Sequence, residues 1–110
     1  MDRQAQLERE LQRATDLIIR QYSPERVILF GSLAQGRIHE WSDIDLAIVK
    51  ETPHRFLDRI GDVLGLVRPT VGFNVVVYTP KEVAQMEASD HYFWIDEIVK
   101  KGKVLYDRTR

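Results

Sequence analysis

Two short apolar runs constrain the fold of this 110-residue chain more than any other feature. The first, Val27-Ile28-Leu29-Phe30, ends at Gly31, and the second extends from Ile44 to Val49. Their length and their β-branched content predict buried strands. The segment between them is mostly polar and lacks the periodicity of a crossover helix. Two strands joined without a helix predict a mixed sheet, since parallel neighbours need a long crossover connection.

The rest of the chain predicts helices and further strands around this pair. In the helical segments, apolar residues recur at steps of three and four residues, and in the strand segments they form short continuous runs. The helices are expected over 3–22, from Thr52-Pro53 to 67, after the capping box Thr79-Pro80-Lys81-Glu82, and from Ser89 to Gly102, and the strands over 73–78 and 103–106. This order predicts an α/β (α+β) fold, a mixed β-sheet flanked by helices, in a single domain over residues 1–110.

Charge and composition exclude several function classes. Sixteen Lys and Arg residues against 17 Asp and Glu residues give a formal net charge of -1, which argues against a nucleic-acid-binding protein. The absence of cysteine excludes a disulfide scaffold, a thiolate metal site and a cysteine nucleophile. No signal peptide and no membrane-spanning run is visible, so we expect a soluble, cytoplasmic protein without a membrane partner.

The polar segment after the first strand has the features of a phosphate-binding loop. Gly31 ends the strand where a tight turn needs an unhindered backbone. A short helix is expected from Leu33, and the backbone N–H groups at its start, together with the Ser32 hydroxyl, are suited to bind an anion. Gly36 provides a second hinge or allows close approach to a ligand. Taken alone, a glycine-serine pair is more often a plain turn.

Asp43 and Asp45 have the features of a metal site. Side chains two residues apart on a strand point to the same face, and two carboxylates placed so close repel each other unless a cation lies between them. Mg²⁺ is usually bound by one or two carboxylates plus substrate phosphates. Ile44 and Leu46 face the other way and fix the strand to the core. A lone Asp-x-Asp is more often a solvated strand end, so the prediction depends on its combination with the glycine-serine pair.

Together these two segments resemble the signature of the minimal nucleotidyltransferases in the DNA polymerase beta superfamily: Gly31-Ser32, a ten-residue spacer, then Asp43-x-Asp45. The leader helix, the VILFGS strand, the VVVYTPKE segment and the closing EIVKKGKVLYDR segment also look like that family, so the resemblance covers nearly the whole chain. It implies a polymerase beta palm-like fold and the transfer of a nucleoside monophosphate from ATP or another nucleoside triphosphate to a hydroxyl group, with two Mg²⁺ ions. It also implies that Gly31 and Ser32 hold the triphosphate and that Asp43 and Asp45 bind the metal ions.

Two departures from the family pattern concern the same site. The third carboxylate that members usually carry, at the start of the strand after the crossover helix, corresponds here to Asn74. An amide can coordinate a metal through its oxygen, but it carries no charge and is a poor general base. Arginines that members often carry after the glycine-serine pair are replaced by Leu33 and Gln35. The candidate residues are Asp43, Asp45 and Asn74 for catalysis, and Gly31, Ser32, Gly36, Arg37 and Ser42 for nucleotide binding.

Two functions therefore stay open. The first is a metal-dependent nucleotidyltransferase, and the resemblance implies that small members of this kind pair with a helical HEPN-domain protein, a ribonuclease toxin. The transferase then acts as the antitoxin, in some cases by adding AMP to a tyrosine of its partner. The second is a non-catalytic module of the same fold that binds a nucleotide or a partner, which Asn74 favours. A homo-oligomer is compatible with both, and nucleic acid is not an expected partner.

The aromatic residues leave two further alternatives open. Trp41, beside the proposed metal site, either packs in the core or anchors the loop, or it stacks on a base. Tyr92, Phe93 and Trp94 exceed what one buried helix stripe needs. These three side chains therefore either all pack in the core or partly lie at a partner surface.

Overall fold

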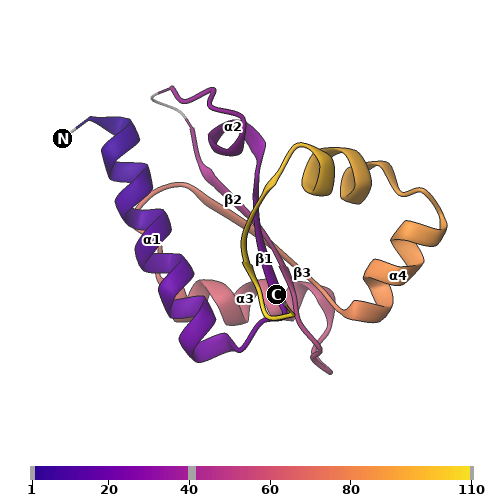
Figure 1. The fold of residues 1–110 in the computed structure, drawn as a ribbon. Coiled ribbons are helices and arrows are strands. Elements are labelled where there is room, and N and C mark those ends of the chain that lie inside the picture. The colour runs from indigo at the N-terminus through magenta and orange to yellow at the C-terminus, as the bar shows by residue number, and fades with distance from the viewer. Residues whose placement is uncertain (1, 40–41, 110) are drawn as a thin grey trace.

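The computed structural model describes residues 2–39 and 42–109, and in these residues four strands form one mixed sheet (Figure 1). Their order across the sheet is β3-β2-β1-β4, and their bounds are β1 Arg26–Phe30, β2 Ile44–Val49, β3 Phe73–Tyr78 and β4 Lys103–Asp107. β1 is antiparallel to both of its neighbours, whereas β2 and β3 are parallel and are connected through helix α3 (Phe56–Val67). The predicted mixed sheet with flanking helices is confirmed.

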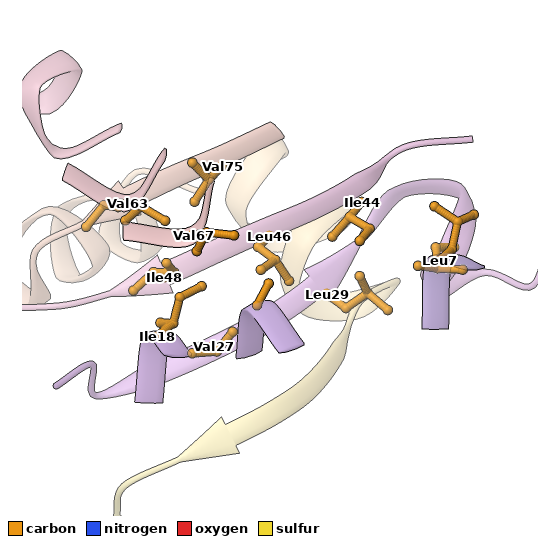
Figure 2. Close-up of a cluster of buried hydrophobic side chains, with 13 residues drawn as sticks. Leu7, Ile18, Val27, Leu29, Ile44, Leu46, Ile48, Val63, Val67 and Val75 are labelled. Carbon is orange, nitrogen blue, oxygen red and sulfur yellow. The ribbon is translucent and has the colours of Figure 1, made fainter. Parts of the chain in front are cut away.

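The larger apolar core lies on the face of the sheet that packs against α1 (Arg3–Tyr22) and α3. Because strand residues alternate between faces, Ile44, Leu46 and Ile48 of β2 are all fully buried on this side. Figure 2 shows these side chains among those of the two helices. The labelled helix residues are Leu7 and Ile18 of α1 and Val63 and Val67 of α3. α1 thus fixes the start of β2, which carries the candidate metal ligands.

The opposite face of the sheet packs against α4 (Pro80–Ala88) and η1 (Phe93–Lys100). Ala47 and Val49 of β2 point to this side and meet the fully buried Trp94 and Ile98 of η1. Trp94 is therefore a core residue. Its sequence neighbours Tyr92 and Phe93 are 62% and 37% exposed, so the cluster of aromatic residues divides between core and surface.

The capping box that the sequence predicts is present. The Thr79 hydroxyl accepts a hydrogen bond from the Glu82 N–H, and the Glu82 carboxylate accepts one from the Thr79 N–H, so α4 starts at Pro80 as expected. The short helix α2 (Gly31–Ala34) starts directly at Gly31, two residues before the expected position at Leu33.

The predicted start of the crossover helix at Thr52 is wrong, because α3 begins at Phe56. The Thr52 hydroxyl accepts a hydrogen bond from the His54 N–H at 3.2 Å and so closes a turn before the helix. Arg59, on the first turns of α3, reinforces that arrangement, since its Nε donates to the His54 carbonyl at 2.8 Å. Side-chain hydrogen bonds to a turn thus prevail over helix capping at this position.

The predicted helix cap at Ser89 is also wrong. Ser89 follows α4 as its C-terminal cap, with its N–H bonded to the Gln85 carbonyl at 3.1 Å. The next helix begins at Phe93 and is wound more widely than an α-helix, with hydrogen bonds that reach five residues back, as from Lys101 to Asp96 at 3.3 Å. This winding keeps Trp94 and Ile98 on one buried side.

Arg59 also ties α3 to the edge of the sheet. Its guanidinium is buried and donates to the Val77 carbonyl at 3.0 Å and to Glu82 Oε1 at 2.7 Å. Covering an edge carbonyl of β3 in this way blocks one site of strand pairing.

Within residues 2–39 and 42–109, no helix combines the length and the apolar character that a membrane span requires.

Candidate functional site

Asp43, Asp45 and Asn74 form one cluster at the end of the sheet. Asp45 pairs in register with Asn74 of the parallel neighbour β3, and Asp43 directly precedes β2. Asn74 Nδ2 donates hydrogen bonds to Asp45 Oδ1 at 2.9 Å and to Asp43 Oδ2 at 3.4 Å. Because Asp45 alternates with the buried Leu46, the cluster lies on the face that α4 and η1 cover further along the sheet. The structure thus brings the three candidate catalytic side chains into mutual contact.

Two glycines leave the space that the carboxylates occupy. Gly31 has a φ of 75°, in the left-handed region, and a Cβ at this position would overlap the Asp45 carboxylate. A Cβ at Gly72 would likewise overlap the carboxylate of Asp43. Gly72 is a site residue that sequence reasoning missed. Its one sequence signal is its position directly before the strand that carries Asn74.

Burial and a neighbouring carboxylate together set the pKa of Asp45. Burial raises the pKa of the Asp45 carboxyl above its ordinary value, the hydrogen bond from Asn74 partly offsets that rise, and the Asp43 carboxylate adds to it. The Asn74 NH₂ group thus lies at a position where positive charge is favourable. It acts there as a weak substitute for a cation, because it presents N–H dipoles to both carboxylates.

Ser32 and Ser42 hold the loop of the candidate nucleotide site together. The Ser32 hydroxyl donates to Ser42 Oγ at 3.3 Å, and the buried Ser42 hydroxyl also accepts from the His39 N–H at 2.9 Å. The Ser42 hydroxyl is therefore directed into the loop and supports its shape, while Ser32 is half-buried at the start of α2.

Gly36 and Arg37 lie on the exposed side of the same loop. Gly36 has a φ of 73°, as the turn after α2 requires of a residue without a side chain. The Arg37 N–H binds the Ser32 carbonyl at 2.9 Å, and its exposed guanidinium donates to Gln35 Oε1 at 2.9 Å. Trp41, for which packing and base stacking were both considered, lies outside the described residues.

Arg3 is a second residue near the site that sequence reasoning missed. Its guanidinium donates to the Ser42 carbonyl at 2.8 Å, so the first turn of α1 is bonded to the residue before Asp43. The two residues are 39 positions apart, and no local pattern connects them. Arg3 therefore adds a positive charge next to the loop between the glycine-serine pair and Asp43. In that loop, Leu33 and Gln35 replace the arginines that family members often carry.

The chemistry of the donor set fits a hard divalent cation. Asp43 and Asp45 supply carboxylate oxygens from neighbouring positions, and Mg²⁺ is commonly bound by two carboxylates plus phosphate oxygens. In the described part of the chain, no group of three or more His, Cys, Asp or Glu residues is placed to hold a metal ion. The third oxygen donor of the cluster is the amide of Asn74, which would have to turn its oxygen toward the ion.

Comparisons with known proteins bear on the family and the fold of the chain. The family model described as "Polymerase beta, Nucleotidyltransferase" matches residues 12–110, a range that contains the glycine-serine pair and both aspartates. A solved structure described as "a putative nucleotidyltransferase from Sulfolobus solfataricus" is similar with a TM-score of 0.67 and 20% identity, over 97% of this chain and 86% of that chain. At that identity the likeness shows the fold alone. Among curated proteins, none matches the chain.

Proposed function

Because the chain belongs to the polymerase beta nucleotidyltransferase family, we propose that it transfers a nucleoside monophosphate from a nucleoside triphosphate to a hydroxyl group. The observation that carries the proposal is the contact between Asp43, Asp45 and Asn74 directly beside Gly31. In the reaction, the acceptor oxygen forms a bond to the α-phosphorus, the bond from that phosphorus to the β-phosphate oxygen breaks, and pyrophosphate leaves. ATP is the donor that we expect.

The loop after β1 would hold the triphosphate. The Ser32 hydroxyl, the backbone at Gly31 and Gly36, and the exposed guanidinium of Arg37 provide donors and positive charge at the end of the sheet. Phosphate oxygens favour such backbone and arginine donors. Ser42 would act indirectly, because its hydroxyl fixes the loop through Ser32 and His39.

Asp43 and Asp45 would hold Mg²⁺, in the two-metal arrangement that the family implies. Ions held by these two carboxylates would supply positive charge to the phosphates of the nucleotide and polarise the phosphorus centre. The two glycines at positions 31 and 72 keep the carboxylates in place, since any side chain there would displace them. The amide nitrogen of Asn74 would have to leave its present contacts with both carboxylates.

The proton of the attacking hydroxyl needs an acceptor, and Asn74 cannot supply one. Its amide nitrogen donates hydrogen bonds to the aspartates, and an amide oxygen is a very weak base. A positioned general base contributes about 10²- to 10⁴-fold in rate, so turnover should be slow unless the acceptor molecule or a bound phosphate takes the proton.

The acceptor that we propose is a protein, a HEPN-domain helical partner with which this chain would form a toxin–antitoxin pair in the cytoplasm. This part of the proposal rests on the family resemblance of the glycine-serine and Asp-x-Asp segments. Transfer of AMP to a tyrosine of the partner would join a bulky anion to that residue and alter its surface chemistry.

The second candidate function is a binding module of the same fold, and the hydrogen bonds from Asn74 favour it. In this function the amide stabilises the carboxylate pair without a cation, and the chain neutralises its partner by contact. A module that only binds its partner needs neither Mg²⁺ nor the aspartates, whereas a module that binds a nucleotide differs from the transferase only in the absence of transfer.

Calorimetric titration of the purified chain with ATP, with and without Mg²⁺, tests the binding step of the proposal, and transfer of label from α-labelled ATP to the partner tests the reaction. We expect Mg²⁺-dependent binding that the Asp43→Asn/Asp45→Asn double variant loses. Asp58→Asn, an exposed aspartate on α3, is the matched control and should bind like the wild type. Equal Mg²⁺-ATP affinity in the wild type and the double variant would contradict the assignment of the aspartates.

A further inference from the structure

A long groove runs between α1 and the edge strand β4, which are indigo-purple and yellow in Figure 1. It consists of two adjoining cavities of about 360 and 620 Å³ that share Glu8, Leu11 and Leu105. The smaller cavity continues along α1 to Ile19, and the larger one continues to the loop after α2. The larger cavity is also lined by Gln4, Leu29, Leu33, Gly36, Ile38 and Lys103.

The floor of this groove is apolar and belongs to the incompletely covered edge of the larger core. Leu11, Ile38 and Leu105 pack against that core but remain half-buried. Thr15 also lines the smaller cavity, but its hydroxyl is buried and has no hydrogen-bond partner among the described residues. The groove therefore offers mainly apolar area from Leu11, Ile38 and Leu105 to an incoming segment.

The walls of the groove carry opposite charges. Glu8 and Asp16 lie on the α1 wall, where each accepts a hydrogen bond only from a neighbouring glutamine of the same helix, and neither forms an ion pair with a described residue. Lys103 lies on the opposite wall, on β4. A segment that fits between these walls would present basic side chains toward α1.

The sheet edge itself disfavours a strand as the occupant. The pairing of β4 with β1 shifts between Val27 and Ile28, so that Val27 faces Tyr106, Ile28 faces Val104, and Leu105 is an extra, bulged residue. Bulges disrupt the regular row of hydrogen-bonding groups that strand addition needs. A helix does not need the hydrogen-bonding groups of a strand edge. The α1 wall of the groove runs from Gln4 to Ile19, which at 1.5 Å per helical residue is about 22 Å, or about four turns.

We propose that the α1–β4 groove docks an amphipathic helix of a partner protein, with apolar side chains on Leu11 and Leu105 and Lys or Arg beside Glu8 and Asp16. Such a helix would complete the helical layer on this face of the sheet. A second copy of this chain is the alternative occupant, and the oligomeric state of the chain in solution tests it. The proposal rests on the lining of this groove and does not depend on nucleotidyl transfer.

Two synthetic helical peptides of about 15 residues, the length of the α1 wall, test this proposal. Both carry the same leucine stripe, one with lysine and the other with glutamate at the flanking positions, and both are labelled with fluorescein. Anisotropy titration should show tighter binding of the lysine peptide. Amide NMR shifts should then change along α1 and β4 rather than around the exposed Tyr92, which precedes η1, and the exposed Val99 of η1.

Variants locate the contact. Glu8→Gln/Asp16→Asn should weaken lysine-peptide binding about three- to tenfold, the range that two exposed ion pairs supply. Leu105→Ser should weaken both peptides. The matched controls, Glu51→Gln/Asp58→Asn and Leu57→Ser, change exposed carboxylates and the 75% exposed Leu57 elsewhere, and should bind like the wild type.

Three outcomes would overturn the proposal. Equal affinity for the two peptides would remove the charge argument, and equal losses in the control variants would show unspecific binding. Sedimentation analysis of the chain alone gives the third outcome: a dimer that Leu105→Ser dissociates would identify a second copy as the occupant.

Discussion

Replacement of Glu10 by glutamine should destabilise the protein strongly although it changes only one atom of the side chain. Glu10 is buried on α1, with its side chain 7% exposed. Its carboxylate accepts two hydrogen bonds from Arg13, at 2.8 and 2.9 Å, and one from the Thr70 N–H at 2.6 Å. Thr70 lies in the connection between α3 and β3, so this carboxylate joins α1 to the segment that leads to Gly72 and Asn74.

The pKa of Glu10 sets the size of the effect. The hydrogen bonds from Arg13 lower it most, burial opposes them, and the Thr70 N–H lowers it further, so that the pKa falls from 4.5 to about 2. This difference corresponds to at most about 3 kcal/mol of folding free energy. Because the folded pKa is depressed, the contribution is complete above pH 4.5 and is lost as the pH falls through about 2.

Urea denaturation of the wild type and Glu10→Gln, at several pH values, measures this contribution. The free energies of unfolding should differ by about 3 kcal/mol at pH 7 and by about 1.5 kcal/mol at pH 3, since the wild type loses the charge on acidification and the variant has none to lose. Other acidic groups titrate alike in both proteins and cancel in the difference. Glu8→Gln, two residues earlier on the exposed side of α1, should change stability by less than about 0.5 kcal/mol. A difference that stays constant from pH 7 to pH 3 would refute the electrostatic reasoning.

Four further changes test the site and its supports. Asn74→Asp should raise the rate of transfer of label from α-labelled ATP to the partner by about 10²-fold or more relative to the wild type, and should lower the free energy of unfolding in the absence of Mg²⁺. Gly72→Ala should displace the carboxylate of Asp43 and reduce Mg²⁺-ATP affinity in calorimetry, and unchanged affinity would contradict the overlap seen at this position. Arg59→Met should cost about 3 kcal/mol in urea denaturation, because the variant removes the guanidinium donors from the Glu82 carboxylate and from the carbonyls of His54 and Val77. Thr79→Ala should cost about 1 kcal/mol in the same assay through loss of the helix cap, whereas no change would show that the cap is dispensable.

Much of the fold could be predicted because its signals are local. The apolar run of β2, the Thr79 capping box and the periodicity of α1 up to Tyr22 each depend on residues within a few positions of one another. The two wrong helix starts, at Thr52 and Ser89, have a common cause. Both hydroxyl residues can close a turn or a helix end as well as start a helix, and the neighbouring contacts decide between these uses.

The candidate site also has one part that local sequence signals predict and another part that depends on the pairing of strands. Asp43 and Asp45 are close in sequence, and the period of a strand places them on one face, so the sequence alone determined that a carboxylate pair follows the glycine-serine loop. That Asn74 joins the pair follows from the parallel register of β2 and β3, which the sequence indicates only through the family resemblance.

The tertiary structure alone decided which distant residues support that pair. Arg3 reaches the Ser42 carbonyl, Glu10 holds the Thr70 N–H, and Gly72 leaves room for the Asp43 carboxylate. These contacts depend on the order of the strands and on the packing of α1 across the sheet. No periodic pattern in the sequence indicates either of them. Local backbone preferences are encoded within a few residues, whereas contacts between distant segments exist only after the whole core has formed.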